Sequence, residues 1–351
     1  VRATLTNGRV SGRLLGWLRA VLPKLEGPAL NRALGRVGRI LCPRRVLPTE
    51  VVIAITHCRG LLELTAGSPR VIVVQDGLDH VSKEPCGFPA DLVVTWNDDL
   101  AADWARHQGP APHVVARPAK FEYAAAVADR QAPRADPAHL VYALSSFPSG
   151  GSIANERFVE EVQLMRTFVE QAAAAFPDAE LSVKPHPIGK PGHLDEHIAA
   201  LSVPVRVLPY EGSPTGDYVL TGAYNGGRAE LLEQASLVVG IWTTFLLDSA
   251  VAGVPVTMID LRASDAFPRL VWSLQGPHVR HLEEQVGYLL SLDAEGRLHT
   301  PDGLAALIDR AAQRSASTRA WLLGAPSLDT AVPAAIDALQ AVEPTTAPGP
   351  G

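Results

Sequence analysis

The residues best suited to chemistry lie where short apolar runs end. The stretch LSVKPHP, residues 181–187, leads from strand-forming residues into a cation and an imidazole, Lys184 and His186, set among prolines. Pro185 has no N–H to give to a ladder, so a strand should stop there and the chain should leave the sheet. The fixed φ of Pro185 and Pro187 lowers the entropy lost in holding Lys184 and His186 against an anion. This stretch predicts a phosphate site; the alternative is a proline-rich turn with a surface histidine.

Two further stretches of the second half have the same character. The buried run SLVVGIW leads into Thr243 and Thr244 at an expected helix start, where hydroxyls and unpaired backbone N–H groups meet. A Ser/Gly-rich loop follows the run LVYAL; this serine loop, residues 145–152, contains Ser145, Ser146 and Gly150. Each element alone is weak, since Thr243 is also a plain helix cap. Together, after parallel strands of one domain, they predict a shared nucleotide-phosphate site.

The first half contains a candidate general base. The loop QDGLDH follows the run VIVV, and its Asp76 stands on a tight turn before a glycine, next to Gln75. Partial burial there would raise the pKa of Asp76 enough for it to accept a proton from a sugar hydroxyl. His80 is the competing base, and a turn without chemistry is the other alternative. His57 and Arg59 follow the preceding strand and are expected on the acceptor side of the site; an ordinary βα loop is the commoner alternative.

The elements that position these residues are βα repeats. Continuous β-branched runs, rather than alternating ones, favour parallel sheets covered on both faces. The runs are 51–55, 71–74, 92–95 and 113–116 in the first half and 140–144, 181–184, 205–209, 236–242 and 254–259 in the second. Helices are expected at about 155–176, 194–201, 281–292, 302–323 and 329–342. This alternation predicts an α/β chain with two parallel sheets.

The predicted domains follow from this rhythm. Residues 1–45 form a basic amphipathic segment, residues 46–125 an N-terminal Rossmann-like acceptor domain, and residues 126–330 a C-terminal Rossmann-like donor domain. A C-terminal helix and a disordered tail occupy residues 331–351. Because the sequence begins with Val rather than Met, a first strand missing from the N-terminal domain is an open alternative.

Composition excludes several classes of protein. The chain has 351 residues, enough for two domains with their own cores. Cys42, Cys58 and Cys86 are too few and too far apart for a disulfide framework or a zinc site, which favours the cytoplasm. No apolar run approaches the ~20 residues of a membrane span, and no signal peptide pattern is visible. The net charge of −6 predicts no nucleic-acid partner and no metal is called for.

The N-terminal segment departs from this acidic average. Residues 1–45 hold ten Arg or Lys residues against one acid, Glu26, and Leu14, Leu18 and Val21 recur at helical spacing. Such a segment suits peripheral contact with the anionic inner face of a membrane. A scaffold helix with a solvated basic face is the commoner alternative.

These motifs resemble those of the bacterial sialyltransferases and polysialyltransferases, which have the GT-B architecture. Their (D/E)(D/E)G motif is matched by Gln75-Asp76-Gly77, their HP motif by His186-Pro187 and their Ser/Thr pair by Thr243-Thr244. The resemblance spans roughly residues 50–260, with Gln75 where the family has an acid. The chain also resembles, more distantly, the CDP-glycerol glycerophosphotransferases, whose first-domain loop carries a catalytic His-Gly instead of Asp-Gly.

The resemblance implies two Rossmann-like domains with parallel sheets facing across a cleft. It further implies an inverting, metal-independent transferase without a cofactor, which moves a sugar from a CMP-activated donor to a glycan or lipid-linked acceptor. Asp76 would be the general base, and His186 with the Ser/Thr pair would hold the donor phosphate. A CDP-polyol phosphotransferase and a non-catalytic nucleotide-sugar-binding scaffold protein are the two alternatives.

Overall fold

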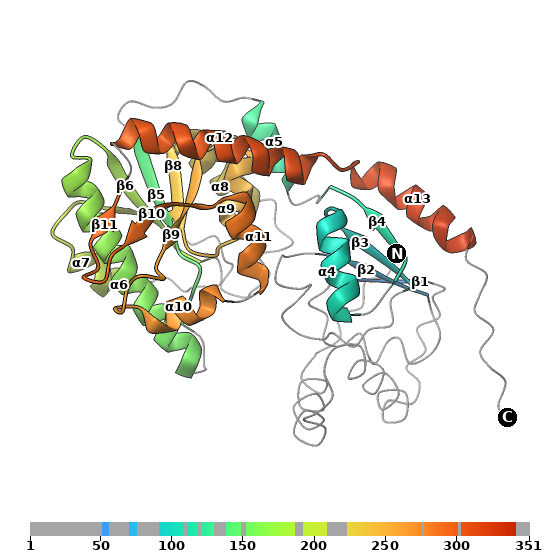
Figure 1. Ribbon diagram of the computed structural model, residues 1–351. Helices are drawn as coiled ribbons and strands as arrows, with labels where there is room; N and C mark the ends of the chain where they lie inside the picture. Colours follow the sequence, from blue (N-terminus) through green and yellow to red (C-terminus); the bar gives the residue numbers. More distant parts are fainter. Residues whose placement is uncertain are drawn as a thin grey trace, which may run out of the picture. The chain divides into compact units, whose positions relative to one another are not determined.

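The protein consists of two compact units, each built on a parallel sheet (Figure 1). Unit 1 comprises Val1–Ala119 and Gly324–Gly351, and unit 2 comprises Lys120–Leu323. The computed structural model describes residues 51–55, 70–75, 91–108, 111–117, 121–129, 138–148, 152–186, 192–208, 223–275, 277–300 and 303–341. The expectation of an α/β chain with two parallel sheets is thereby confirmed.

Unit 1 contains a four-stranded sheet in the order β1-β2-β3-β4, with every neighbouring pair parallel. Its elements are β1 (Val51–Ile55), β2 (Arg70–Val74), β3 (Leu92–Thr95), α4 (Asp98–Gln108), β4 (His113–Val115) and α13 (Leu328–Ala341). The four residues of β3 are all buried, as expected for a strand with neighbours on both sides. The sheet runs in chain order, so each strand lies beside its successor.

Unit 2 contains a seven-stranded sheet in the order β11-β10-β9-β8-β5-β6-β7. All neighbouring pairs are parallel except β10 and β11. The strands are β5 (His139–Ala143), β6 (Glu180–Lys184), β7 (Arg206–Val207), β8 (Leu237–Gly240), β9 (Val256–Asp260), β10 (Tyr288–Leu292) and β11 (Leu298–His299). The chain order reverses at β5, which lies between β8 and β6.

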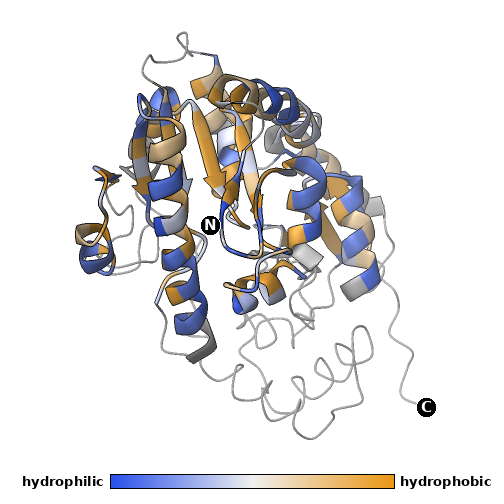
Figure 2. Ribbon diagram, turned by 60° about the vertical axis from the view of Figure 1, so that its left-hand side comes forward, coloured by the Kyte–Doolittle hydropathy of each residue, from blue (hydrophilic) through white to orange (hydrophobic). Residues whose placement is uncertain are grey.

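Helices cover this sheet, and hydrophobic residues concentrate on its strands while the outward faces of the helices are largely hydrophilic (Figure 2). The helices are α5 (Glu122–Ala128), α6 (Ser152–Ala175), α7 (Asp195–Ala199), α8 (Ala223–Gln234), α9 (Phe245–Val251), α10 (Pro268–Leu274), α11 (Pro277–Gln285) and α12 (Leu304–Leu323). All seven residues of α9 are buried, so this short helix is stabilised by packing rather than by its own propensity.

The unit boundaries differ from the predicted domain limits of 125/126 and 330/331. The first predicted limit falls inside α5, which contacts α8 and α9 of unit 2. At the other end, Ala331 and Ala335 of α13 join the core of unit 1 with Ile72, Leu92 and others of its sheet. The C-terminal helix therefore belongs to unit 1, because its apolar face is buried there.

One predicted helix, residues 281–292, is wrong in its second half. The helix α11 ends at Gln285, and Gly287 adopts a left-handed backbone with φ of 72°. Glycine reaches this conformation without the cost of a Cβ, so it ends the helix here. The residues that follow form β10, which pairs in parallel with β9.

The burial of α13 generates a prediction about stability. Ala335 is 2% exposed, whereas its neighbour Ala334 lies on the exposed face of the same helix. Ala335→Asp would place an unpaired carboxylate in an apolar core and should lower the free energy of unfolding by ~3 kcal/mol or more. Ala334→Asp, the matched control, should change it by less than ~0.5 kcal/mol. Urea denaturation followed by circular dichroism would measure the free energy of unfolding of both variants. An equal decrease in the two variants would contradict the placement of α13.

Candidate functional site

The exits of three neighbouring strands lie at one edge of the unit 2 sheet. β6, β5 and β8 are adjacent and parallel, so their carboxyl ends point the same way. β6 ends at Lys184, as predicted. The carbonyl of Lys184 accepts the N–H of Leu144 at 2.9 Å, and Pro185 has no backbone N–H with which to continue the ladder. The residues after β5, after β6 and after β8 are therefore brought together, as the sequence predicted.

Lys184 is a buried cation at this edge. Its side chain is 4% exposed, and Nζ lies 4.6 Å from the centroid of the Phe245 ring at the start of α9. Nζ also donates a hydrogen bond to the carbonyl of Pro185 at 3.3 Å. A cation over an aromatic face is held in place while it keeps its charge. The lysine is thus positioned between the exits of β6 and β8.

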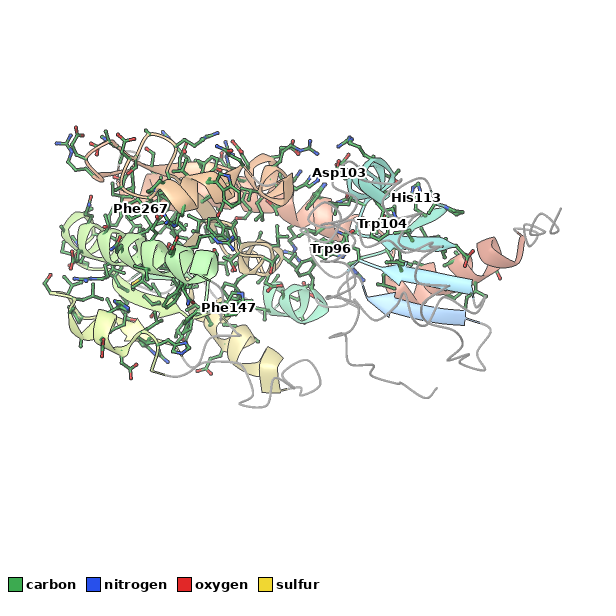
Figure 3. The ribbon with its side chains drawn as sticks, turned by 90° about the horizontal axis from the view of Figure 1, so that it is seen from below. Trp96, Asp103, Trp104, His113, Phe147 and Phe267 are labelled. Carbon is green, nitrogen blue, oxygen red and sulfur yellow. The ribbon has the colours of Figure 1, made fainter. Side chains whose placement is uncertain are left out.

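His186 is positioned by an aromatic neighbour from the loop after β5. The imidazole is partly buried and stacks on the ring of Phe147, with 4.7 Å between centroids and 27° between planes. Phe147 is labelled in Figure 3. This stack joins the loop after β6 to the loop after β5. His186 is therefore in contact with the loop after β5.

Ser145 connects the same loop to two other elements. Its N–H donates to Oε1 of Glu161, on α6, at 2.6 Å, and its Oγ accepts the N–H of Trp242 at 3.3 Å. Trp242 follows β8. Ser145 thus joins the exits of β5 and β8 to the long helix behind them, and both it and Ser146 are partly buried.

Glu161 is the residue of this cluster that sequence reasoning missed. Its side chain is 0% exposed, and burial raises the pKa of its carboxyl to about 7, although hydrogen bonds from Ser146 and Ser145 partly offset this rise. The sequence held a signal: Glu161 lies three residues after Phe158 and four before Met165, on the apolar stripe of the predicted helix. An acid on a buried stripe needs partners, and those partners proved to be the serine loop.

The two threonines after β8 differ in their surroundings. Thr243 is partly buried, its Oγ1 accepts the N–H of Phe245 at 3.3 Å, and its carbonyl accepts the N–H of Leu246 at 3.2 Å. These two bonds hold Thr243 at the start of α9. Thr244 is exposed and its side chain makes no capping bond to α9.

Gly240, the last residue of β8, allows this turn to approach β5. A Cβ at this position would lie 3.1 Å from the carbonyl oxygen of Ala143 and 3.1 Å from Cγ2 of Thr243. Both contacts are tighter than most Cβ contacts, so a side chain here would push its neighbours aside by a few tenths of an ångström. Glycine therefore lets the exits of β5 and β8 lie this close without such a shift.

Gln75 of unit 1 has a structural role. Its N–H donates to the carbonyl of Val94 at 2.9 Å, its Oε1 accepts the N–H of Trp96 at 3.2 Å, and its carbonyl accepts the indole N–H of Trp96 at 3.1 Å (Figure 3). Both side chains are buried. These bonds tie the exit of β2 to the exit of β3.

Several predicted residues lie outside the described residues. They are His57, Arg59, Asp76, Gly77, His80, Gly150 and Pro187, together with the basic segment 1–45. In the part of the chain that the structure does describe, no group of three or more His, Cys, Asp or Glu side chains could hold a metal ion. Among the same residues, no helix has the length and apolar character of a membrane span.

Comparisons with known proteins yield structural likenesses only. No family model and no curated protein sequence matches the chain. A trehalose-6-phosphate synthase structure is 10% identical, covers 96% of this chain and 85% of its own, and has a TM-score of 0.44. The glycosyltransferase SnogD from Streptomyces nogalater is 15% identical over 96% and 80%, with a TM-score of 0.39. A putative UDP-N-acetylglucosamine 2-epimerase from Listeria monocytogenes is 14% identical over 90% and 81%, with a TM-score of 0.45.

The raised pKa of Glu161 predicts a specific pH dependence of stability. The carboxyl has a pKa of about 7 in the folded chain and its ordinary lower value when unfolded, so the folded state binds the proton more tightly. The free energy of unfolding should therefore fall by about 3 kcal/mol as the pH rises from acidic values through 7, because the folded state then gives up the proton that it binds more tightly. In Glu161→Gln this fall should be absent.

The measurement is the free energy of unfolding of both proteins at pH 5 and pH 8. Glu170→Gln, the same substitution on the same helix, is the control and should leave the wild-type pH dependence intact. Identical pH dependence in wild type and Glu161→Gln would contradict the assignment of a shifted pKa to Glu161.

Proposed function

We propose that the protein is an inverting, metal-independent glycosyltransferase that moves a sialic acid-like sugar from a CMP-activated donor to a glycan hydroxyl during synthesis of a surface polysaccharide or glycoconjugate. One observation carries the proposal: Lys184, His186 and the serine loop meet at the carboxyl edge of one parallel sheet. That edge, beside the point where strand order reverses, is where open α/β sheets bind ligands.

The chemistry of this edge suits a nucleotide phosphate. Lys184 supplies a positive charge in a largely buried setting, where its effect on an anion is stronger than in water. His186 is held against Phe147 and offers an imidazole donor. Ser145, Ser146 and Thr244 add hydroxyl groups from the neighbouring exits. A cation, an imidazole and several hydroxyl groups are a typical phosphate-binding set.

These groups would act mainly on the leaving group. As the bond from the anomeric carbon to the phosphate oxygen breaks, its electron pair goes to CMP, whose phosphate becomes more anionic. Lys184 and His186 would stabilise that charge, and fixed donors of this kind can each contribute ~3 kcal/mol to the transition state. A lysine and an imidazole donor would thereby do the work that a divalent metal does in other transferases.

The acceptor side of the reaction rests on the sequence. Asp76 would take the proton of the acceptor hydroxyl while the oxygen forms its bond to the anomeric carbon, on the face opposite the departing CMP, which inverts the configuration. His57, Arg59, Gln75 and His80 would stand near the acceptor. The bonds of Gln75 to Val94 and Trp96 support this role only indirectly, since they place the start of the Asp76 loop at a strand exit.

The setting would be the cytoplasm, with residues 1–45 in peripheral contact with the inner membrane face. A lipid-linked acceptor would make such contact useful, because it concentrates the enzyme beside its substrate. Basic residues near an anionic surface can contribute up to ~1 kcal/mol each to this contact.

A donor panel tests the function. Thermal-shift measurements with CMP, CDP, UMP, UDP, GDP and dTDP should show specific stabilisation by CMP, about 2.7 kcal/mol at a hundredfold excess over Kd. Transfer from a CMP-activated sugar would then support the proposal. Transfer from a CDP-polyol would instead identify a polyol-phosphate transferase, and nucleotide binding without turnover would identify a scaffold protein.

We predict that His186→Ala weakens CMP binding and lowers turnover together, each by about tenfold or more, because it removes a donor to a phosphate present in ground and transition states. Isothermal titration calorimetry and initial rates would measure both. His299→Ala, on the exposed edge strand β11, is the control and should leave both unchanged. Wild-type affinity in His186→Ala would exclude this edge as the donor site.

Asp76→Asn should separate binding from chemistry. We expect CMP affinity within a few-fold of wild type and turnover lower by ~10² or more, since a general base contributes roughly 10²–10⁴ to the rate. Affinity and turnover would be measured on the same preparations. An Asp76→Asn enzyme with full activity would transfer the role of base to His80, which His80→Ala would then check.

A further inference from the structure

Glu161 is a buried acid that the proposed reaction does not use. It lies on α6 beneath the loop that follows β5, and its side chain has no exposed surface. In the part of the chain that the structure describes, no lysine, arginine or histidine forms an ion pair with it. Its carboxylate is instead bound by the loop, through the N–H of Ser145 at 2.6 Å. A charge held only by hydrogen bonds costs more in a dry interior than one with an ion partner.

The loop that binds Glu161 is the loop of the proposed phosphate site. Ser145 also accepts the N–H of Trp242 at 3.3 Å, so the acid is two hydrogen bonds from the exit of β8. Two residues further on, Phe147 stacks on His186 at 4.7 Å. A change in the charge of Glu161 therefore acts on the element that joins the three strand exits.

Several described elements that contact α6 carry titratable groups. From β5, Tyr142 faces it with a fully buried hydroxyl that has no hydrogen-bond partner, and Glu161 helps to raise the pKa of that phenol further above its ordinary value. From α10, Arg269 is paired with Glu160, directly before Glu161 on α6, and with Glu156. Two further described elements contact α6: α7, which carries Asp195, Glu196 and His197, and β11, which carries His299.

We propose that Glu161 is a positioning residue that couples phosphate binding at the serine loop to the uptake of one proton. In the empty site its carboxylate holds the loop through Ser145. When a phosphate binds on the other side of the loop, the carboxylate takes a proton from solvent and becomes a neutral carboxylic acid, whose carbonyl oxygen still accepts the Ser145 N–H. The proposal rests on the proposed function, in that the phosphate is taken to be that of the donor.

The physical reason is repulsion between like charges across one loop. A carboxylate and a phosphate separated by a few residues of protein repel strongly, because the low dielectric of the interior screens them poorly. Protonation of Glu161 removes that repulsion. By linkage, protonation of Glu161 strengthens phosphate binding, and phosphate binding strengthens proton binding to Glu161 by the same factor.

The experiment compares the affinity of wild type and Glu161→Gln for CMP and for inorganic phosphate between pH 5.5 and pH 8.5. The glutamine side chain of this variant has the shape of the protonated glutamic acid and carries no charge. We expect the variant to bind both probes roughly tenfold more tightly than wild type at pH 8.5 and equally at pH 5.5. Titration of the probe itself affects both proteins alike and cancels in the ratio.

Glu170→Gln is the matched control, since it removes the same charge from the same helix more than two turns away from Glu161. Its affinity ratio to wild type should not vary with pH. A ratio for Glu161→Gln that is constant with pH would overturn the coupling, and so would the same pH-dependent ratio in Glu170→Gln.

A second measurement counts the protons directly in wild type and Glu161→Gln. Calorimetry of phosphate binding at pH 7.5, in two buffers with different ionisation enthalpies, counts the protons taken up, and Glu161→Gln should take up fewer. Equal proton uptake would overturn the proposal even while CMP still binds and the proposed function stands. Proton-coupled binding of inorganic phosphate without binding of CMP would sustain the proposal while excluding a CMP donor. If neither CMP nor inorganic phosphate binds, the coupling and the proposed function are both wrong.

Discussion

The parallel adjacency of β8, β5 and β6 is the constraint on which the rest of the structure depends. Ladder hydrogen bonds join each pair, so the three strands must end at one edge. The chain then leaves the sheet at Pro185, at Gly240 and after Leu144, and each exit has a different local cause. The proline lacks an N–H, and the glycine permits a close approach to β5. Strand order alone therefore brings the exits of β5, β6 and β8 to one edge of the sheet, before any single side chain is considered.

Two buried charges of opposite sign meet the cost of desolvation in different ways. Lys184 lies over the ring of Phe245 and donates to a backbone carbonyl, so its charge interacts with a quadrupole and a dipole. Glu161 accepts hydrogen bonds from the serine loop and has a pKa raised to about 7. The acid takes up a proton near neutral pH, whereas the lysine is held in place by its contacts with an aromatic ring and a carbonyl oxygen.

Unit 1 depends on residues from both ends of the described chain. Its sheet is small, and its core includes Ala331 and Ala335 of α13, more than two hundred residues from β3 and β4. The N–H of Arg117 donates to the carbonyl of Pro326 at 2.7 Å, which fastens the start of this C-terminal segment to the end of β4. A four-stranded sheet needs such cover, because a sheet buries its apolar faces only against another layer.

The strands and their exits were predictable from sequence because their causes are local: β-branched runs, Pro185, and the glycines and serines that follow. Local patterns also placed Lys184 and His186 together with the serine loop. Asp76, His57, Arg59 and His80 remain predictions from sequence. The membership of α13 in unit 1, the strand β10 in place of a helix, and the role of Glu161 were decided by tertiary structure. Each depends on a partner distant in the chain: the sheet of unit 1, the free edge of β9, and the loop sixteen residues before Glu161. Local signals existed, since Gly287 ends α11 and Glu161 lies on an apolar stripe. The distant segment that each element packs against or pairs with is not encoded locally, so only the fold could assign it.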